Sequence, residues 1–224
     1  MANPTNLIVG PQLAADSAVI GSRAGRQGDQ IVSELHGRFY EQCLRGNLYG
    51  TGMTSAVALS ANTITLTATT TPILGIYNPP SSPVNAVVLQ ATLQDYINNV
   101  TSVFPGPFVW AGSTGNVAVS TGLTPTNLKT LAAAGSNCKG FAGATALTGL
   151  TNNLVAFMGA GFPTASGLLT TTVAASTPTP SVGGVENIDG AIIVVPGGVL
   201  ALLNVTSSTT HSVWGRLIWE EVPI

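Results

Sequence analysis

The chain has 224 residues, of which only 7% are charged, and its formal net charge is −2. Soluble domains usually contain about 25% charged residues, and a surface with so little charge favours association. Seven basic residues are too few for a groove that tracks a phosphate backbone, which argues against nucleic-acid binding. No apolar run reaches the ~20 residues of a membrane helix, and no secretory signal peptide is recognisable, so we expect no membrane partner.

The few charges are concentrated at the two ends of the chain. Residues 1–28 are broken by glycines and a Gly-Pro pair, which predicts an extended arm that orders only against a partner. We therefore divide the chain into an N-terminal arm with a short helix, residues 1–50, and a β-sandwich body, residues 51–224.

Residues 29–45 carry apolar side chains at spacings of three to four, which predicts a helix. Glu41 and Arg45 form a pair four residues apart in the favourable direction. Gly46-Asn47 follows as a stop signal. Gly37 lies in the middle of the segment and weakens the helix, so a pair of strands remains an alternative.

The body shows strand signals separated by turn residues. In residues 87–94 the odd-numbered side chains are expected on one face and the even-numbered ones on the other. The segments 108–111 and 117–120 flank a glycine-rich turn and predict a hairpin. Many short strands with regular turns predict a mainly β fold, a two-sheet antiparallel sandwich. The expected strands are residues 63–67, 87–94, 108–111, 117–120, 154–158, 191–195, 199–205 and 212–222.

Catalytic chemistry has few candidate residues. The two histidines, His36 and His211, have no second metal ligand at a useful spacing. No phosphate-binding loop and no Gly-x-Ser-x-Gly elbow at a strand–helix junction are present. We expect no enzymatic activity, no metal and no cofactor. The two cysteines, Cys43 and Cys138, are interpreted as free buried thiols, with their pairing left open.

Two acidic pairs were considered as sites. Glu186 and Asp189 lie in a glycine-rich stretch that could hold a cation, but a polar turn before the next strand is the preferred interpretation. Glu220 and Glu221 point to opposite faces if they lie on a strand, so they cannot act as a paired acid and base. Salt bridges or interface contacts are expected for them.

The last strand carries two tryptophans on opposite faces. Val213, Leu217 and Trp219 are expected on one face, and Trp214 and Arg216 with Ile218 on the other. A strand that is apolar on both faces is covered on both faces, which favours an interface beside Trp214. The alternative is one buried tryptophan and one that is partly exposed.

Four stretches resemble known sequences. Residues 188–202, with their Pro-Gly-Gly turn, and 212–222, ending in Trp-Glu-Glu-Val, resemble the closing strands of viral jelly-roll proteins. Residues 37–41 and 140–153 resemble uncharacterised virion proteins of tailed bacteriophages. The resemblance implies an antiparallel jelly-roll-like β-sandwich, a virion location after synthesis in the host cytoplasm, and a homo-oligomer, expected as a trimer. The implied partners are sister subunits and other virion proteins such as the major capsid protein.

The leading hypothesis is a capsid decoration or minor capsid protein that docks through its arm and its last strand. The alternative is a tail fibre, spike or adhesin module that binds glycans through Trp110, Tyr77 or Tyr96; a major capsid protein is a third option. The expected docking residues are Arg23, Arg26, Arg38, Phe39, Tyr40, Arg45, Trp214 and Arg216.

Overall fold

A computed structural model of the chain describes residues 38–59, 71–97, 108–114, 122–133, 135–142, 154–157, 182–204 and 208–224. The contacts divide the chain into two compact units, Met1–Tyr40 and Glu41–Ile224. Only the last three residues of the first unit are among those described. The second unit holds every described strand and begins at Glu41, whereas the sequence placed the start of the body at residue 51.

The body is mainly β, with one short helix. In chain order the elements are α1 (Tyr40–Arg45), β1 (Leu48–Gly52), β2 (Val57–Leu59), β3 (Leu74–Tyr77), β4 (Val84–Ile97), β5 (Phe108–Ser113), β6 (Thr126–Asn127), β7 (Lys139–Ala142), β8 (Leu154–Phe157), β9 (Val182–Val194), β10 (Val199–Asn204) and β11 (Ser208–Pro223).

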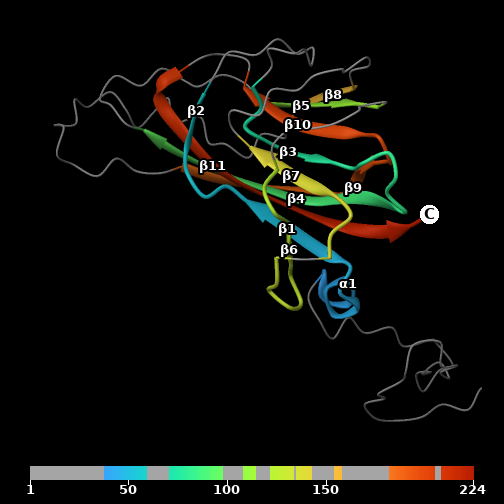
Figure 1. Ribbon diagram of the computed structural model, residues 1–224. Helices are drawn as coiled ribbons and strands as arrows, with labels where there is room; N and C mark the ends of the chain where they lie inside the picture. Colours follow the sequence, from blue (N-terminus) through green and yellow to red (C-terminus); the bar gives the residue numbers. More distant parts are fainter. Residues whose placement is uncertain are drawn as a thin grey trace, which may run out of the picture. The chain divides into compact units, whose positions relative to one another are not determined.

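These strands form two antiparallel sheets that face each other (Figure 1). The six-stranded sheet has the order β6-β1-β11-β4-β9, with β2 also paired to β11. The five-stranded sheet has the order β7-β3-β10-β5-β8. The predicted antiparallel, mainly β class with a short helix is confirmed.

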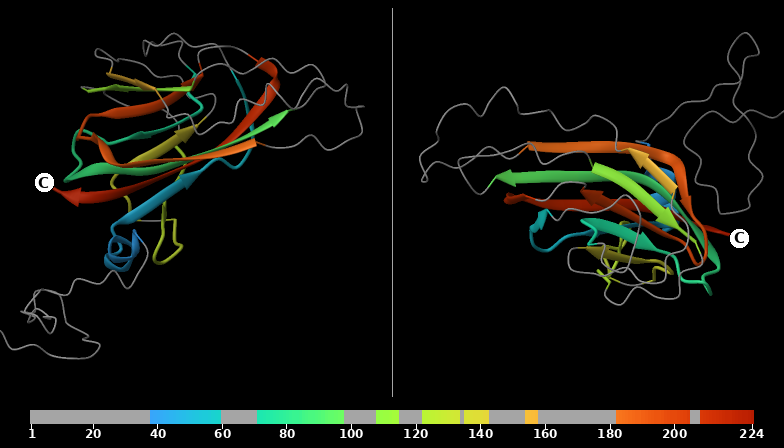
Figure 2. Two further views of the ribbon diagram at one scale, coloured as in Figure 1. Left: turned by 180° about the vertical axis from the view of Figure 1, so that it is seen from behind. Right: turned by 90° about the horizontal axis from the view of Figure 1, so that it is seen from above.

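The main strands pair in a nested manner. β1 pairs with β11, β3 with β10, β4 with β9 and β5 with β8, all antiparallel. Each pair therefore joins a strand near the start of the body to one near its end. Further pairing of β11 with β4 and of β10 with β5 closes the sheets. The two views in Figure 2 show the two layers, with the long strands β4, β9 and β11 side by side in one of them.

The core lies between the two sheets. The inner face of the five-stranded sheet contributes Leu74 and Leu202, and the six-stranded sheet contributes Leu93, Leu217 and Trp219, all fully buried. Tyr49 stacks on Trp219 with ring centroids 6.4 Å apart. Burying side chains of this size contributes about 1.5–3 kcal/mol each, so this layer is the main source of stability.

A β-bulge changes the face pattern in β4. The pairing with β9 shifts between Val88 and Gln90. Opposite this shift, Asp189 and Gly190 take positive φ angles of 55° and 81°. Val88 therefore lies in the core together with Ala91. The predicted strict alternation through residues 87–94 is wrong because a bulge breaks the two-residue period.

Helix α1 is shorter than the helix predicted over residues 29–45. It begins at Tyr40, and residues 29–37 lie outside the described residues. Its predicted end is confirmed: Gly46 has φ +80°. The amide of Gly46 donates to the Cys43 carbonyl and that of Asn47 to the Gln42 carbonyl. These two bonds form a Schellman cap, which satisfies the last carbonyls of the helix.

Other predicted segments have mixed outcomes. The segments 63–67 and 117–120 lie outside the described residues, so the hairpin proposed with 108–111 is not among the observed pairings; β5 pairs instead with β10 and β8. The glycine-rich stretch around Glu186 and Asp189 is not a turn before a strand, because it lies within β9.

The turn at Pro196-Gly197-Gly198 carries the chain from one sheet to the other. Gly197 has φ +79°, and its amide donates to the Asn78 carbonyl. The Asn78 side chain is fully buried and its Nδ2 donates to the carbonyls of Val84 and Val194, at 2.8 and 2.9 Å. Asn78 thus ties the end of β9 to the start of β4.

The five-stranded sheet is also buried on its outer face. Tyr77, Val109, Phe141 and Leu203 belong to a second apolar cluster there, and each is at most 4% exposed. A sheet that is apolar on both faces is covered on both. Among the described strands, the exposed large apolar side chains lie on the six-stranded sheet.

Candidate functional site

The candidate site is the outer face of the six-stranded sheet, which turns away from the core. On β11 the side chains of Val213, Leu217 and Trp219 are fully buried, whereas Trp214 and Arg216 are exposed. The predicted faces of this strand are confirmed. Trp214 is 37% exposed, which agrees with the alternative interpretation of one buried and one partly exposed tryptophan.

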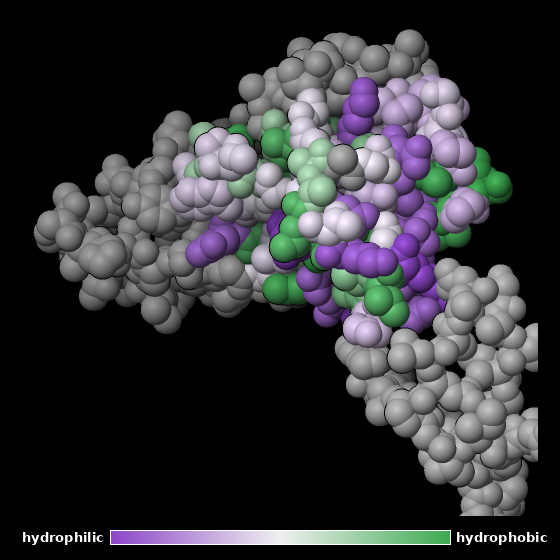
Figure 3. Space-filling view, turned by 60° about the horizontal axis from the view of Figure 1, so that its bottom comes forward, coloured by the Kyte–Doolittle hydropathy of each residue, from purple (hydrophilic) through white to green (hydrophobic). Residues whose placement is uncertain are grey.

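Neighbouring strands complete this face with uncharged side chains. Gln94 lies beside Trp214 in the register, and Thr92 lies beside Arg216. On β9, Val185 is 54% exposed. The Gln90 amide donates to Asn187 Oδ1 at 2.9 Å, joining β4 to β9. Figure 3, with this side turned forward, shows hydrophobic and hydrophilic residues interspersed.

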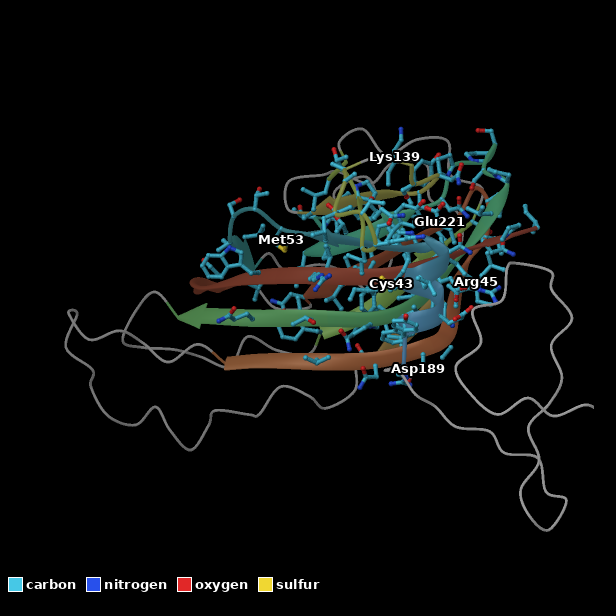
Figure 4. All side chains as sticks on the ribbon, turned by 90° about the horizontal axis from the view of Figure 1, so that it is seen from below. Cys43, Arg45, Met53, Lys139, Asp189 and Glu221 are labelled. Atoms are coloured by element: carbon cyan, nitrogen blue, oxygen red, sulfur yellow. The ribbon has the colours of Figure 1, made fainter. Side chains whose placement is uncertain are left out.

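Helix α1, which carries Cys43 and Arg45, lies at one end of the same face (Figure 4). Arg45 Nε contacts Glu41 Oε1 at 2.9 Å, as the sequence predicted, and both side chains are exposed. Partial burial raises the pKa of Glu220, although the charge of Arg45 acts to lower it. Leu44 is 49% exposed on this helix.

The structure places only some of the eight predicted docking residues in the same unit. Arg45, Trp214 and Arg216 belong to the same unit, and Trp214 and Arg216 are exposed on the face of β11 that turns away from the core. The Arg38 guanidinium lies 5.5 Å from the centre of the Phe39 ring, and Tyr40 is 43% exposed. These three belong to the other unit. The remaining two, Arg23 and Arg26, fall outside the described residues.

Sequence reasoning missed the contribution of β4 and β9 to this face. Val185, Asn187 and Ile193 were assigned to a turn or left without a role. Their alternation with buried residues was a usable signal, but the bulge at Asp189 interrupts it. Leu44 was included in a helix without being considered as a contact residue.

A second notable feature is the buried carboxylate of Glu221, which is 5% exposed. It accepts hydrogen bonds from the backbone amides of Asn137 and Cys138, the Asn137 side chain and the Ser136 hydroxyl. The Trp219 indole also donates to it, at 3.4 Å. These bonds occupy the carboxylate with the protein's own donors, so its role is to hold residues 136–138 against β11. The prediction that Glu220 and Glu221 point to opposite faces is confirmed.

Two of the three aromatic residues proposed for sugar binding have described side chains, and neither is accessible to a sugar. Trp110 is 1% exposed and its Nε1 donates to Glu186 Oε2 at 2.9 Å, which links β5 to β9 across the two sheets. Tyr77 is 4% exposed. Neither can stack on a sugar, and the side chain of Tyr96 lies outside those described.

Within the described ranges, no group of three His, Cys, Asp or Glu side chains is placed to hold a metal ion. His36 and the side chain of His211 fall outside these ranges. Among the helices of the same ranges, none has the length and apolar character that crossing a membrane requires.

No protein-family model, curated protein or solved structure matches the chain. The functional argument therefore depends on the residues themselves.

The two free cysteines are expected to differ in reactivity. Cys43 is partly exposed and Cys138 is buried. Burial, and then the nearby Glu221 carboxylate, raise the pKa of the Cys138 thiol, and the thiolate is the reactive form. In the native protein at neutral pH, iodoacetamide should modify Cys43 and leave Cys138 unmodified, as measured by peptide mass spectrometry. Both should react in denaturant; rapid native labelling of Cys138 would contradict its position.

Proposed function

We propose that the chain is a non-enzymatic structural protein of a virion, a capsid decoration or minor capsid protein that assembles as an oligomer on the particle. The observation that carries this proposal is the broad, nearly uncharged outer face of the six-stranded sheet, which displays Trp214, Val185 and Ile193. Exposed apolar side chains gathered on one face are typical of interaction surfaces. The exposed apolar side chains on this face support assembly as the proposed role.

The nested strand pairing supports a jelly roll as the finer description of the fold. Eight main strands pair first with last, second with seventh, third with sixth and fourth with fifth. A jelly roll is such a long antiparallel hairpin wound into two sheets. Jelly rolls occur in viral capsid proteins and also in lectins, and a fold does not fix a function. The virion assignment therefore also draws on the sequence resemblance of the closing strands.

The glycan-binding alternative is weakened because Trp110 and Tyr77, two of its three aromatic candidates, are buried. A sugar platform needs an exposed ring flanked by polar groups. The assembly hypothesis needs only contact surface, which the outer face provides. We therefore retain assembly as the proposed function.

Removal of the arm provides the test in the particle. A chain without residues 1–28 is expected to fold, because Glu41–Ile224 forms a compact unit with its own core. It should give the far-ultraviolet circular dichroism and urea midpoint of the full-length body, but be lost from purified particles. Full-length chain supplied in the same way is the control. Normal incorporation of the truncated chain would contradict the docking role of the arm, and absence of the full-length chain from particles would contradict the virion assignment.

A further inference from the structure

We infer that a second copy of this chain binds at the end of the six-stranded sheet that adjoins α1, which we call the α1 end. The α1 end consists of α1, residues 128–132 after β6, the end of β9 with Val195, and residues 220–224. The inference rests on the proposed function, because it narrows the assembly surface to one end and names its partner. It depends on the exposed apolar side chains there, on the backbone of Leu131 and on the local charges.

Strand pairing brings these segments to the same end of the sheet. Leu48, the first residue of β1, lies opposite Glu220 near the end of β11. The start of β4 pairs with the ends of both β11 and β9. Because β6 runs antiparallel to β1, the residues that follow Asn127 lie at this end too. Figure 1 shows the loop after β6 next to α1, to which the Asn127 side chain joins it.

The α1 end carries most of the exposed large apolar side chains of the described residues. They are Leu44 (49% exposed), Leu131 (77%), Ile193 (54%), Val195 (42%), Val222 (37%) and Ile224 (75%). They come from α1, the loop after β6 and the ends of two strands, so segments far apart in the sequence meet in one apolar region. Exposed apolar side chains gathered in this way are typical of protein contact sites.

The backbone of Leu131 is an independent sign of a contact site. Its φ angle is 57°, and the other described residues with positive φ are four glycines and Asp189. A bulky side chain in this region costs free energy, because its Cβ crowds the backbone. Since the Leu131 side chain is largely exposed, packing within the chain does not offset that cost. Backbone outliers of this kind cluster at functional sites, and a partner that buries Leu131 would supply the missing contacts.

The loop that carries Leu131 is fixed by hydrogen bonds. Asn127 Nδ2 donates to the Gly46 carbonyl at 2.7 Å, which joins the loop to the end of α1. Asn127 Oδ1 accepts from the amides of Lys129 and Thr130. The Leu131 amide donates to the Asn127 carbonyl at 2.8 Å. Leu131 is therefore held in place before a partner binds, which lowers the entropy cost of the contact.

The charges at the α1 end favour a second copy over a strongly charged partner. Apart from the buried Glu221, the charged side chains of α1, of residues 128–132 and of residues 220–224 are Glu41, Arg45, Lys129 and Glu220, two of each sign. Two such ends meet without a net like charge. A strongly acidic or basic partner would find no complementary charge there.

The size of the α1 end also suits a contact between two copies. Five strands about 4.8 Å apart and two sheets about 10 Å apart, with their outer side chains, make an end of roughly 24 Å by 20 Å. Two such ends bury on the order of 1,000 Å² in total, about the lower limit for a specific interface. Because both copies use the same patch, the contact is isologous and has a two-fold axis.

Replacing Leu131 with asparagine tests the contact in the full-length chain. Light scattering across a concentration series should show a wild-type dimer that dissociates on dilution. Leu131→Asn should raise the dissociation constant at least about tenfold, because the apolar side chain is lost from the contact. The same change should leave the urea midpoint unchanged or raise it, because asparagine adopts a positive φ more readily than leucine. Unchanged association of the Leu131→Asn chain would overturn the inference.

Strand β9 offers a matched pair of variants. Ile193 and Val185 are each 54% exposed and lie toward opposite ends of this strand. Ile193→Thr should raise the dissociation constant about fivefold, whereas Val185→Thr should change it by less than about twofold. The reverse result would place the contact at the other end of the outer face. It would overturn this inference while leaving assembly in place.

Crosslinking gives a measurement that does not depend on the dissociation constant. β11 is the middle strand in the order β6-β1-β11-β4-β9, so a two-fold axis through the middle of the α1 end brings position 224 of two copies together. With a short bismaleimide, Ile224→Cys in a Cys43→Ser background should form covalent dimers, and Val185→Cys in the same background should not. Dimers only with Val185→Cys would contradict the inference. A chain that is monomeric at every concentration, yet present in purified particles, would overturn it and leave the virion assignment in place.

Discussion

Replacing Glu221 with alanine is expected to lower the free energy of unfolding by about 3 kcal/mol, since each buried donor left without an acceptor costs about 1–3 kcal/mol. The carboxylate accepts from two backbone amides, of Asn137 and Cys138; the Cys138 amide also reaches the Ser136 hydroxyl oxygen at 3.1 Å. Some of the freed donors will reach water because Asn137 is exposed, which limits the loss. Urea denaturation followed by tryptophan fluorescence measures the change.

The conservative variant Glu221→Gln sharpens this test. It keeps the shape and one acceptor oxygen but turns an NH₂ group toward the amide donors, so we expect a loss of about 2 kcal/mol. Glu220→Gln, one residue away on the opposite face, is the matched control and should change stability by less than about 0.5 kcal/mol. A Glu221→Gln chain as stable as the wild type would show that the carboxylate does not hold the 136–138 segment.

Replacing Gly75 with alanine is expected to destabilise the body by about 3 kcal/mol or more, because added atoms in a packed core force side chains and backbone to shift. A Cβ at this position would overlap the Phe141 ring and lie 2.5 Å from the Leu200 carbonyl oxygen. Gly75 is in the register opposite Phe141 and Ala201, in the middle of the five-stranded sheet. Thermal and urea unfolding should both show the loss.

Gly52→Ala provides the matched comparison in the other sheet. Its added Cβ would lie 4.0 Å from the Gly215 carbonyl, an ordinary contact. Alanine in a strand is favoured over glycine by roughly 0.5–1 kcal/mol, so this variant should be neutral or slightly more stable. Equal stability of the Gly75 and Gly52 variants would contradict the close approach of β3 to β7 and β10.

The sequence predicts what depends on neighbours along the chain. The Glu41–Arg45 pair, the Gly46-Asn47 helix end and the two faces of the last strand follow from local spacing and residue type, and the structure confirms each. The mainly β, antiparallel class was also predictable from turn spacing. Local patterns carry this information because the same residues make the contacts.

The predictions that were wrong concern features that depend on distant parts of the chain. The change of face along β4 arises from a bulge opposite Asp189, which lies about one hundred positions later in the chain. The residues around Val88 show no pattern that predicts this bulge. Glu221 was expected in a salt bridge or an interface, but its partners lie more than eighty positions earlier. Trp110 was a candidate for an exposed, sugar-binding ring, but its side chain is buried and its indole donates to Glu186. Such pairings are set by topology, which a single sequence does not reveal.

The strand topology also changes how strongly the described residues support each functional hypothesis. With Trp110 and Tyr77 buried and the outer face of the five-stranded sheet covered, the exposed apolar side chains that remain in the strands lie on β9 and β11. That distribution favours a protein that works by contact with other subunits.

A reconstruction, by electron cryomicroscopy, of virus particles purified from cells that produce this chain tests the central claim most directly. The proposal predicts density for the two-sheet body at symmetric positions on the head, in many copies. Particles of normal composition that contain no copy of the chain would contradict it.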